Sequence, residues 1–182
     1  MNQDIHSEKV YLPLMLEVSK KNILLIGGGS ACAEKLRTLS QLGKRVTAIA
    51  PEFSDSFDGL DWIDFIYRKY MPGDLKNYDI AYVGINNFSE EMKILEEAKL
   101  ENVLVNFVDQ PAFSDFISAS VLIKKFFSIF ISTNGRGPGA AKMIRKEIES
   151  KLDLDALNER AGEFIAERKK KMEDKNSDEF SA

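Results

Sequence analysis

Between residues 23 and 108, short apolar runs alternate with longer stretches in which apolar residues return every three or four positions. The short runs have the length of buried strands, and the longer stretches, 31–42 and 89–100, have the period of helices packed on one side. Gly43 suits the end of the first helix, and Ser89 suits the N-cap of the second. Strands that alternate with helices favour a doubly wound parallel sheet, which is an α/β fold. The predicted strands are residues 23–26, 46–50, 62–67, 80–85 and 103–108.

After this alternation, two β-prone runs follow each other directly, at residues 116–123 and 126–132. Only Lys124 and Lys125 separate them, so they predict a hairpin-like pair outside the parallel sheet. The change of pattern falls near Pro111, where we place a boundary between two parts of the chain.

The C-terminal third predicts two helices. Pro138 suits the first turn of a helix that ends near residue 152, and a second helix is expected at 154–172. Beyond Asp174 we expect a disordered tail. The predicted parts of the chain are residues 1–112, 113–152 and 153–182.

The composition limits the ligands that this chain can take. The 182 residues include 25 Lys and Arg against 29 Asp and Glu, a formal net charge of −4, so we expect no nucleic-acid partner. One cysteine, Cys32, and one histidine, His6, cannot form a His/Cys metal cluster, so no metal site is expected. The first nine residues have no continuous apolar segment, and no run approaches ~20 apolar residues, so we expect a cytoplasmic protein without membrane contact.

A glycine-rich loop lies between the first strand and the first helix, and it matches the G-x-G-x-x-G/A pattern of dinucleotide-binding loops, with Cys32 in the last small position. Gly27 would allow the tight turn, and Gly29 would let a diphosphate approach the backbone at the helix N-terminus. This context makes the domain Rossmann-like. The alternative is a glycine-rich turn without a ligand. The loop comprises Gly27, Gly28, Gly29, Ser30, Ala31 and Cys32.

Pro51 and Glu52 follow the second predicted strand, where a carboxylate can accept the ribose hydroxyls of a dinucleotide. No Arg or Lys follows immediately to bind a 2′-phosphate, so the pattern favours NAD over NADP. Alternatively, Glu52 begins an exposed loop.

Asp109 comes just after the last predicted parallel strand, at the sheet edge where open α/β sheets bind ligands. The residue could act in catalysis there, or it could cap its own loop.

A second loop that could bind anions precedes the helix at Pro138. Its hydroxyls, glycines and basic residues, with Lys142 and Arg145 on the helix that follows, suit carboxylates or phosphates. The alternative is a flexible helix entry with ordinary surface charges. The candidate binding residues are Ser132, Thr133, Asn134, Gly135, Arg136 and Lys142.

Taken in order, these motifs resemble the precorrin-2 dehydrogenase family, the NAD-dependent module of siroheme synthases. The resemblance covers about residues 11–151 and is carried by the ordered set rather than by any single motif. The matching segments are Leu12-Pro13-Leu14, Gly27-Gly28-Gly29 with Lys35, Ala50-Pro51-Glu52, Asn106-Phe107-Val108-Asp109-Gln110-Pro111, Phe116-Ile117, Ser132-Thr133-Asn134-Gly135, Pro138 and Arg145-Lys146-Glu147.

The resemblance implies that NAD accepts a hydride as precorrin-2 is oxidised to sirohydrochlorin in siroheme biosynthesis. It also implies that Asp109 is the catalytic aspartate, that residues 27–31 with Pro51 and Glu52 contact the nucleotide, and that the chain is a homodimer whose residues 113–152 form the dimerisation and substrate region. Precorrin-2 is a polycarboxylate, which fits the basic residues Arg136, Lys142 and Arg145.

Three alternatives stay open at this stage. The chain could also insert iron as a sirohydrochlorin ferrochelatase, although we expect its C-terminal helical region to be shorter than is typical of the family. It could be a chelatase without dehydrogenase activity, which would work without NAD. It could also be an NAD-sensing regulatory module that passes a signal to a partner.

Overall fold

A computed structural model describes residues 9–179 of the chain. The chain divides into two compact units, Met1–Ser118 and Ala119–Ala182.

The first unit is built on a five-stranded sheet in which every neighbouring pair of strands is parallel. The strand order β3-β2-β1-β4-β5 is that of a doubly wound sheet, so the predicted α/β fold is confirmed. Two helices and two short 3₁₀ turns, η1 and η2, complete the unit over its described residues, 9–118. The elements are β1 (Ile23–Ile26), α1 (Ser30–Gln41), β2 (Val46–Ala50), η1 (Asp55–Phe57), β3 (Ile63–Tyr67), β4 (Ile80–Val83), α2 (Phe88–Glu101), β5 (Leu104–Phe107) and η2 (Pro111–Phe113).

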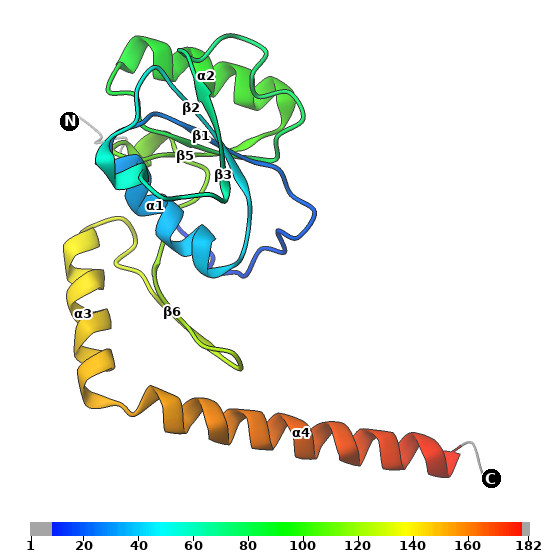
Figure 1. Cartoon of the computed structure of the whole chain (residues 1–182). Coiled ribbons are helices and arrows are strands. Elements are labelled where there is room, and N and C mark those ends of the chain that lie inside the picture. Colours follow the sequence, from blue (N-terminus) through cyan, green and yellow to red (C-terminus); the bar gives the residue numbers. More distant parts are fainter. Residues whose placement is uncertain (1–8, 180–182) are drawn as a thin grey trace, which may run out of the picture. The chain divides into compact units, whose positions relative to one another are not determined.

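The sheet has a hydrophobic core on each face, because successive side chains of a strand point to opposite sides. Leu24 and Ile26 of β1 pack in the cluster that includes Ile94 of α2. Ile23 and Leu25 pack in the other cluster, with Leu36 of α1. Figure 1 shows α1 and α2 on opposite sides of the sheet. Burial on both faces explains why the strands read as continuous apolar runs.

The helix ends follow local capping rules, with one correction. Gly43 has a φ of +64° just after α1, as expected for a glycine that ends a helix. The N-cap of α2 is Asn87 rather than the predicted Ser89, because the Asn87 side chain accepts a hydrogen bond from the backbone N–H of Glu90. The helix therefore begins at Phe88.

The segment after β5 belongs to the first unit, so the division falls later than the predicted residue 112. The N–H of Asp115 donates to the Val105 carbonyl at 2.8 Å, and the Asp115 carboxylate accepts from the N–H of Val105 at 2.9 Å. Asn106 donates from Nδ2 to the carbonyl of Phe116, whose ring packs edge-on against Tyr82. These contacts tie the segment to the edge of the sheet.

The second unit begins with the predicted hairpin, which is an antiparallel pair separate from the parallel sheet. Its first strand starts at Ser120 instead of Phe116. Its turn spans residues 124–127 rather than two lysines, and it is closed by a hydrogen bond from Lys124 N–H to the Phe127 carbonyl. The elements of this unit are β6 (Ser120–Ile123), β7 (Ser128–Ile131), α3 (Pro138–Lys151) and α4 (Leu154–Glu179).

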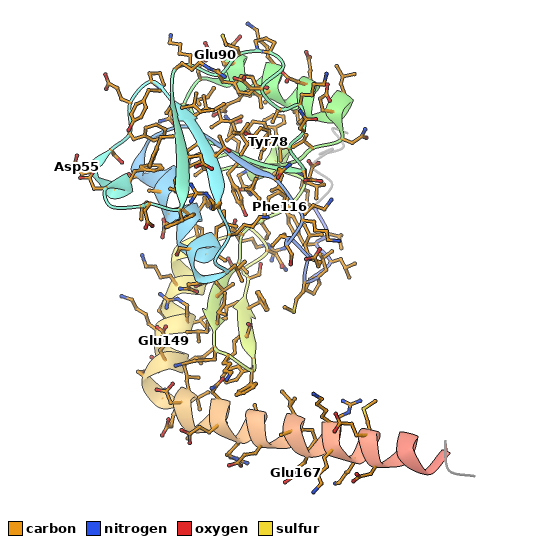
Figure 2. The ribbon with its side chains drawn as sticks, turned by 45° about the vertical axis from the view of Figure 1, so that its right-hand side comes forward. Asp55, Tyr78, Glu90, Phe116, Glu149 and Glu167 are labelled. Carbon is orange, nitrogen blue, oxygen red and sulfur yellow. The ribbon has the colours of Figure 1, made fainter. Side chains whose placement is uncertain are left out.

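The last helix is longer than predicted. It continues to Glu179, so the expectation of a disordered tail directly after Asp174 is wrong for residues 175–179; residues 180–182 lie outside the described part. No Gly or Pro interrupts residues 166–179, which are rich in the helix formers Lys and Glu. Its first turns hold the hairpin tip through the ion pair Lys124–Asp155, while Glu167 points outward (Figure 2).

Candidate functional site

The glycine loop after β1 needs glycine at its first two positions for different reasons. Gly27 has a φ of +125°, and a Cβ there would lie 2.2 Å from the carbonyl oxygen of Gly84. A Cβ on Gly28 would lie 1.9 Å from the carbonyl oxygen of Glu52. The predicted tight turn at Gly27 is therefore confirmed. Gly28 instead allows the loop after β2 to approach, and the Ser54 N–H donates to the Gly28 carbonyl at 2.9 Å.

Gly29 leaves space for a ligand. A Cβ at this position would meet no heavy atom within 4 Å, and Gly29 is the N-cap of α1 without a side-chain capping bond. The N–H groups of the first helical turn have no partner inside their own helix and carry the positive end of its dipole. Ser30 and Ala31, which begin α1, are exposed. The loop therefore fits the diphosphate of a dinucleotide.

Cys32 is a packing residue, as predicted. It is 1% exposed, and its Sγ lies 3.5 Å from the carbonyl oxygen of Gly84. Burial raises the pKa of the Cys32 thiol to about 12, with the negative charge of Asp109 adding to the effect. A small side chain at this position lets α1 lie close to β4, where Gly84 also leaves room: a Cβ there would be 2.6 Å from the sulfur.

Asp109 lies at the same edge of the sheet as the glycine loop. Ile26, Val83 and Phe107 are paired in one row across β1, β4 and β5, and each is the last residue of its strand. Strands β2 and β3 are added on one side of β1, and β4 and β5 on the other, so the strand order switches between β1 and β4. Doubly wound sheets form their ligand crevice at this switch point. Asp109 follows this row by two residues and is exposed, and its negative charge contributes to the raised pKa of Cys32 at the start of α1.

Pro51 and Glu52 are both exposed beyond the end of β2. The contact of the Glu52 backbone with Gly28 places this pair beside the glycine loop. The position fits the predicted contact with a ribose, and the role of the Glu52 carboxylate stays a prediction.

Sequence reasoning missed a buried carboxylate near this crevice. Glu91 of α2 is 5% exposed and accepts a hydrogen bond from Nε2 of Gln110, the residue after Asp109. It also missed the buried Oδ1 of Asn106, which has no partner within the described residues. The sequence carried a signal for Asn106 and Gln110, because both belong to the motif around Asp109. It carried none for Glu91, because the burial of that residue depends on tertiary packing.

In the second unit, the loop before α3 is closed by its own side chains. Thr133 Oγ1 donates to the Gly137 carbonyl at 3.0 Å and accepts from the Gly137 N–H at 3.1 Å. Ser132 Oγ accepts from the N–H of Asn134, which has a left-handed φ of 53°. These two hydroxyls therefore shape the loop, and the exposed Gly135 has a φ of 78°.

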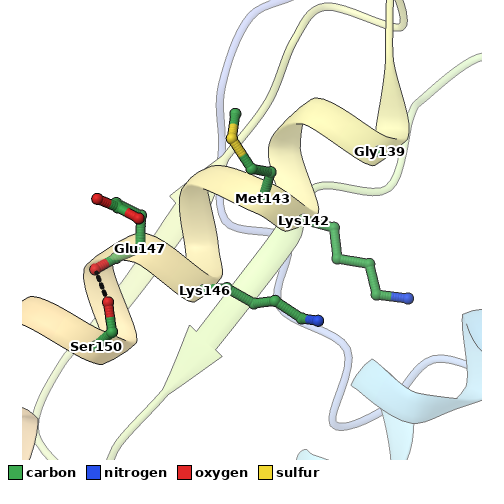
Figure 3. Close-up of a pocket in the computed structure, with 6 residues that line it drawn as sticks. All are labelled: Gly139, Lys142, Met143, Lys146, Glu147 and Ser150. Carbon is green, nitrogen blue, oxygen red and sulfur yellow. Dashed lines mark hydrogen bonds between the residues drawn. The ribbon is translucent and has the colours of Figure 1, made fainter.

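The basic residues of this region separate into exposed and buried ones. Arg136 and Lys142 are exposed, and Lys142 lines a hollow of about 540 Å³ along α3 together with Lys146 (Figure 3). Arg145 is buried and pairs with Glu149 at 2.6 Å. Arg145 therefore does not belong to the exposed basic patch that we predicted. The other residues that line the hollow are Gly139, Met143, Glu147 and Ser150.

Within residues 9–179, no three side chains of His, Cys, Asp or Glu gather as a metal site would require, and His6 lies outside these residues. None of the helices in that range has the length and apolar character needed to span a membrane. The cytoplasmic location stays a prediction.

The sheet topology and the open glycine loop define the class of protein as a dinucleotide-binding α/β protein. Residues 14–120 match a family described as "Putative NAD(P)-binding", which covers more than half of the chain, and residues 128–151 match "Sirohaem biosynthesis protein central". The chain therefore belongs to this NAD(P)-binding family. The match confirms the predicted resemblance and the nicotinamide dinucleotide cofactor that it implies.

Curated relatives carry the name siroheme synthase. That of Vesicomyosocius okutanii subsp. Calyptogena okutanii is 31% identical over 167 residues, which cover 89% of this chain and 36% of the relative. Siroheme synthase 2 of Aeromonas hydrophila is 27% identical over 155 residues, which cover 84% of this chain and 33% of the relative. The chain thus spans about a third of the length of these relatives.

A solved structure shares the fold. SirC, precorrin-2 dehydrogenase, superposes with a TM-score of 0.64 at 21% sequence identity, over 79% of this chain and 71% of that one. This likeness confirms the Rossmann-like architecture.

Proposed function

We propose that this chain oxidises precorrin-2 to sirohydrochlorin with NAD as hydride acceptor, a step of siroheme biosynthesis. The observation that carries the proposal is the position of Asp109 beside the open glycine loop, where β1, β4 and β5 end. The relatives named siroheme synthase and the fold shared with SirC, precorrin-2 dehydrogenase, support the choice of substrate.

Each residue has a defined task in this reaction. The oxidation removes one hydride, which carries both electrons, and one proton from the tetrapyrrole. NAD supplies the hydride acceptor. The backbone amides at Gly29, Ser30 and Ala31 would hold its diphosphate, and Asp109 would take the remaining proton as a general base.

The direct test is anaerobic incubation of the purified chain with precorrin-2 and NAD, followed by the absorbance of sirohydrochlorin. We expect product to form only with the dinucleotide present. Product formation without NAD, or none with it, would contradict the proposal.

We expect tighter binding of NAD than of NADP, because the Glu52 carboxylate would repel a 2′-phosphate. Glu52→Gln keeps the size of the side chain and removes its charge. This variant should reduce the preference for NAD by roughly tenfold, which corresponds to about 1.4 kcal/mol. Calorimetry with both dinucleotides measures the effect. Equal binding of NAD and NADP by the unaltered chain would remove Glu52 from this role.

We assign the loop at residues 132–137 and Lys142 to the carboxylates of the substrate. The amide-rich start of α1 is already assigned to the diphosphate of NAD. The start of α3, with its basic residues, is therefore available for a second polyanion, the carboxylates of precorrin-2. Arg136→Ala and Lys142→Ala should each raise the KM for precorrin-2 by roughly tenfold, as expected for a lost charge-assisted hydrogen bond. The effect should be larger at low salt, because exposed charges are screened within ~10 Å at 0.1 M.

The matched control for this loop is Lys170→Ala, which removes an exposed lysine from α4. Its KM should stay unchanged. A loss of NAD affinity in the Arg136 and Lys142 variants, with the KM for precorrin-2 unaltered, would assign the loop to the cofactor instead.

We also propose that the chain forms a homodimer through its second unit, as the family resemblance implies. This unit exposes several large apolar side chains that a second copy could cover. Sedimentation equilibrium tests this, and a monomer at micromolar concentration would contradict it. The exposed apolar residues include Phe130, Met143, Phe164 and Ile165.

A further inference from the structure

One carboxylate in the first unit is buried without an ion pair in the described contacts. Glu91 stands in the first turns of α2, where the helix dipole favours a negative charge. It is only 5% exposed, whereas its neighbour Glu90 is exposed. A glutamate is rarely buried unless a partner satisfies it. Its partner is the side-chain amide of Gln110, with 2.8 Å between Nε2 and Oε2.

Gln110 is part of the turn that presents Asp109. Its backbone N–H donates to the Phe107 carbonyl at 3.3 Å, and its carbonyl accepts from Ser114 Oγ at 3.3 Å. Ser114 is itself 3% exposed and accepts from the Phe107 N–H. The backbone of the turn is thus held from the β5 side, and Glu91 holds the side chain of Gln110 from α2.

The pKa of Cys32 responds to the charges of both Asp109 and Glu91. Both charges raise the pKa of this buried thiol, beyond the effect of burial itself. Glu91 therefore lies near the start of α1 as well as near the turn, at the crevice described above.

We propose that Glu91 is a positioning residue: through its hydrogen bond to Gln110 it fixes the turn that carries Asp109. The inference rests on the proposed function for its effect on turnover. A proton acceptor works only at the right distance from the atom that it deprotonates, and a misplacement of about 1 Å can cost ~100-fold in rate. Glu91 does not touch the substrate in this proposal, so it acts on kcat and not on binding.

Four variants test the proposal in steady-state kinetics with precorrin-2 and NAD. Glu91→Ala and Gln110→Ala should each lower kcat by roughly 10- to 100-fold, with the KM for precorrin-2 and the Kd for NAD within about twofold. The double variant should be no slower than either single one, because both remove the same contact. Glu91→Gln keeps a carbonyl acceptor for Gln110 and should retain kcat within about threefold of the unaltered chain.

Two controls separate positioning from a general loss of stability. Glu90→Ala removes a carboxylate from the same helical turn without the Gln110 contact and should leave kcat unchanged. In an Asp109→Ala background, Glu91→Ala should have no further effect on kcat, because the group that it positions is gone. A further loss there, or a loss of NAD affinity, would make Glu91 a merely structural residue and overturn the proposal.

A measurement without substrate keeps this inference separate from the proposed function. Hydrogen exchange of the backbone N–H of Gln110 reports how often the turn opens. It should become at least about tenfold faster in Glu91→Ala and stay close to the unaltered rate in Glu91→Gln and Glu90→Ala. If the unaltered chain does not oxidise precorrin-2, the proposed function fails and this exchange rate still decides the inference. An unchanged exchange rate in Glu91→Ala would refute the positioning role.

Discussion

Asp109→Ala is expected to lower the turnover of precorrin-2 oxidation by at least about 100-fold, while the fold and the affinity for NAD stay near normal. The reason is that the variant removes the proposed proton acceptor and leaves the contacts that hold the turn. Those contacts come from Gln110 and Ser114, and no hydrogen bond among the described residues uses the Asp109 carboxylate. Absorbance of sirohydrochlorin under anaerobic conditions measures the turnover, and calorimetry measures NAD binding.

The matched control is Glu101→Ala, at the end of α2 away from the glycine loop. It removes an exposed carboxylate from the same unit and should leave turnover intact. Turnover that survives in Asp109→Ala would exclude the catalytic role. A sharp fall in melting temperature together with activity would favour the alternative that Asp109 caps its loop.

Gly29→Val is expected to abolish measurable NAD binding, with a loss of at least about 100-fold in affinity, because its side chain would occupy the approach of the diphosphate. A Cβ at Gly29 would meet no heavy atom of the protein within 4 Å. Gly29 has a φ of −77° and a ψ of 164°, which valine adopts without strain. The folded state should therefore persist, at a cost of about 1 kcal/mol for a poorer N-cap.

Gly27→Val is the comparison that distinguishes a loss of NAD binding from a loss of stability. That variant would place a Cβ 2.2 Å from the Gly84 carbonyl at a φ of +125°, so it should destabilise the fold itself. Thermal unfolding and calorimetry on both variants distinguish the two effects. If Gly29→Val binds NAD normally, the diphosphate does not approach at this residue.

Much of the first unit was predictable because its signals are local. A run such as residues 23–26 is long enough for a buried strand, and the apolar period of residues 31–42 together with Gly43 defines a helix and its end. The order of strand, glycine loop and helix identified the candidate cofactor loop. Asp109 could be placed at the sheet edge because the carboxyl ends of parallel strands share one edge.

Helix boundaries were less predictable, because neighbouring residues compete for the same role. Asn87 and Ser89 can both cap a helix, and only the backbone conformation at Asn87 decides between them. The end of α4 was missed because a position at the chain terminus was taken as a sign of disorder, although the composition of the segment favours a helix.

By itself, the sequence determined the α/β alternation, the glycine loop and the polar residues that follow the strands. Each of these depends on periodicity or on residues close together in the chain. The tertiary structure alone decided which charged residues are buried: Arg145 of α3 is covered, and Glu91 of α2 is covered and meets Gln110 after the end of β5. This burial depends on how elements pack, and a lysine-, arginine- or glutamate-rich helix has the same local sequence pattern whichever of its charges the fold covers.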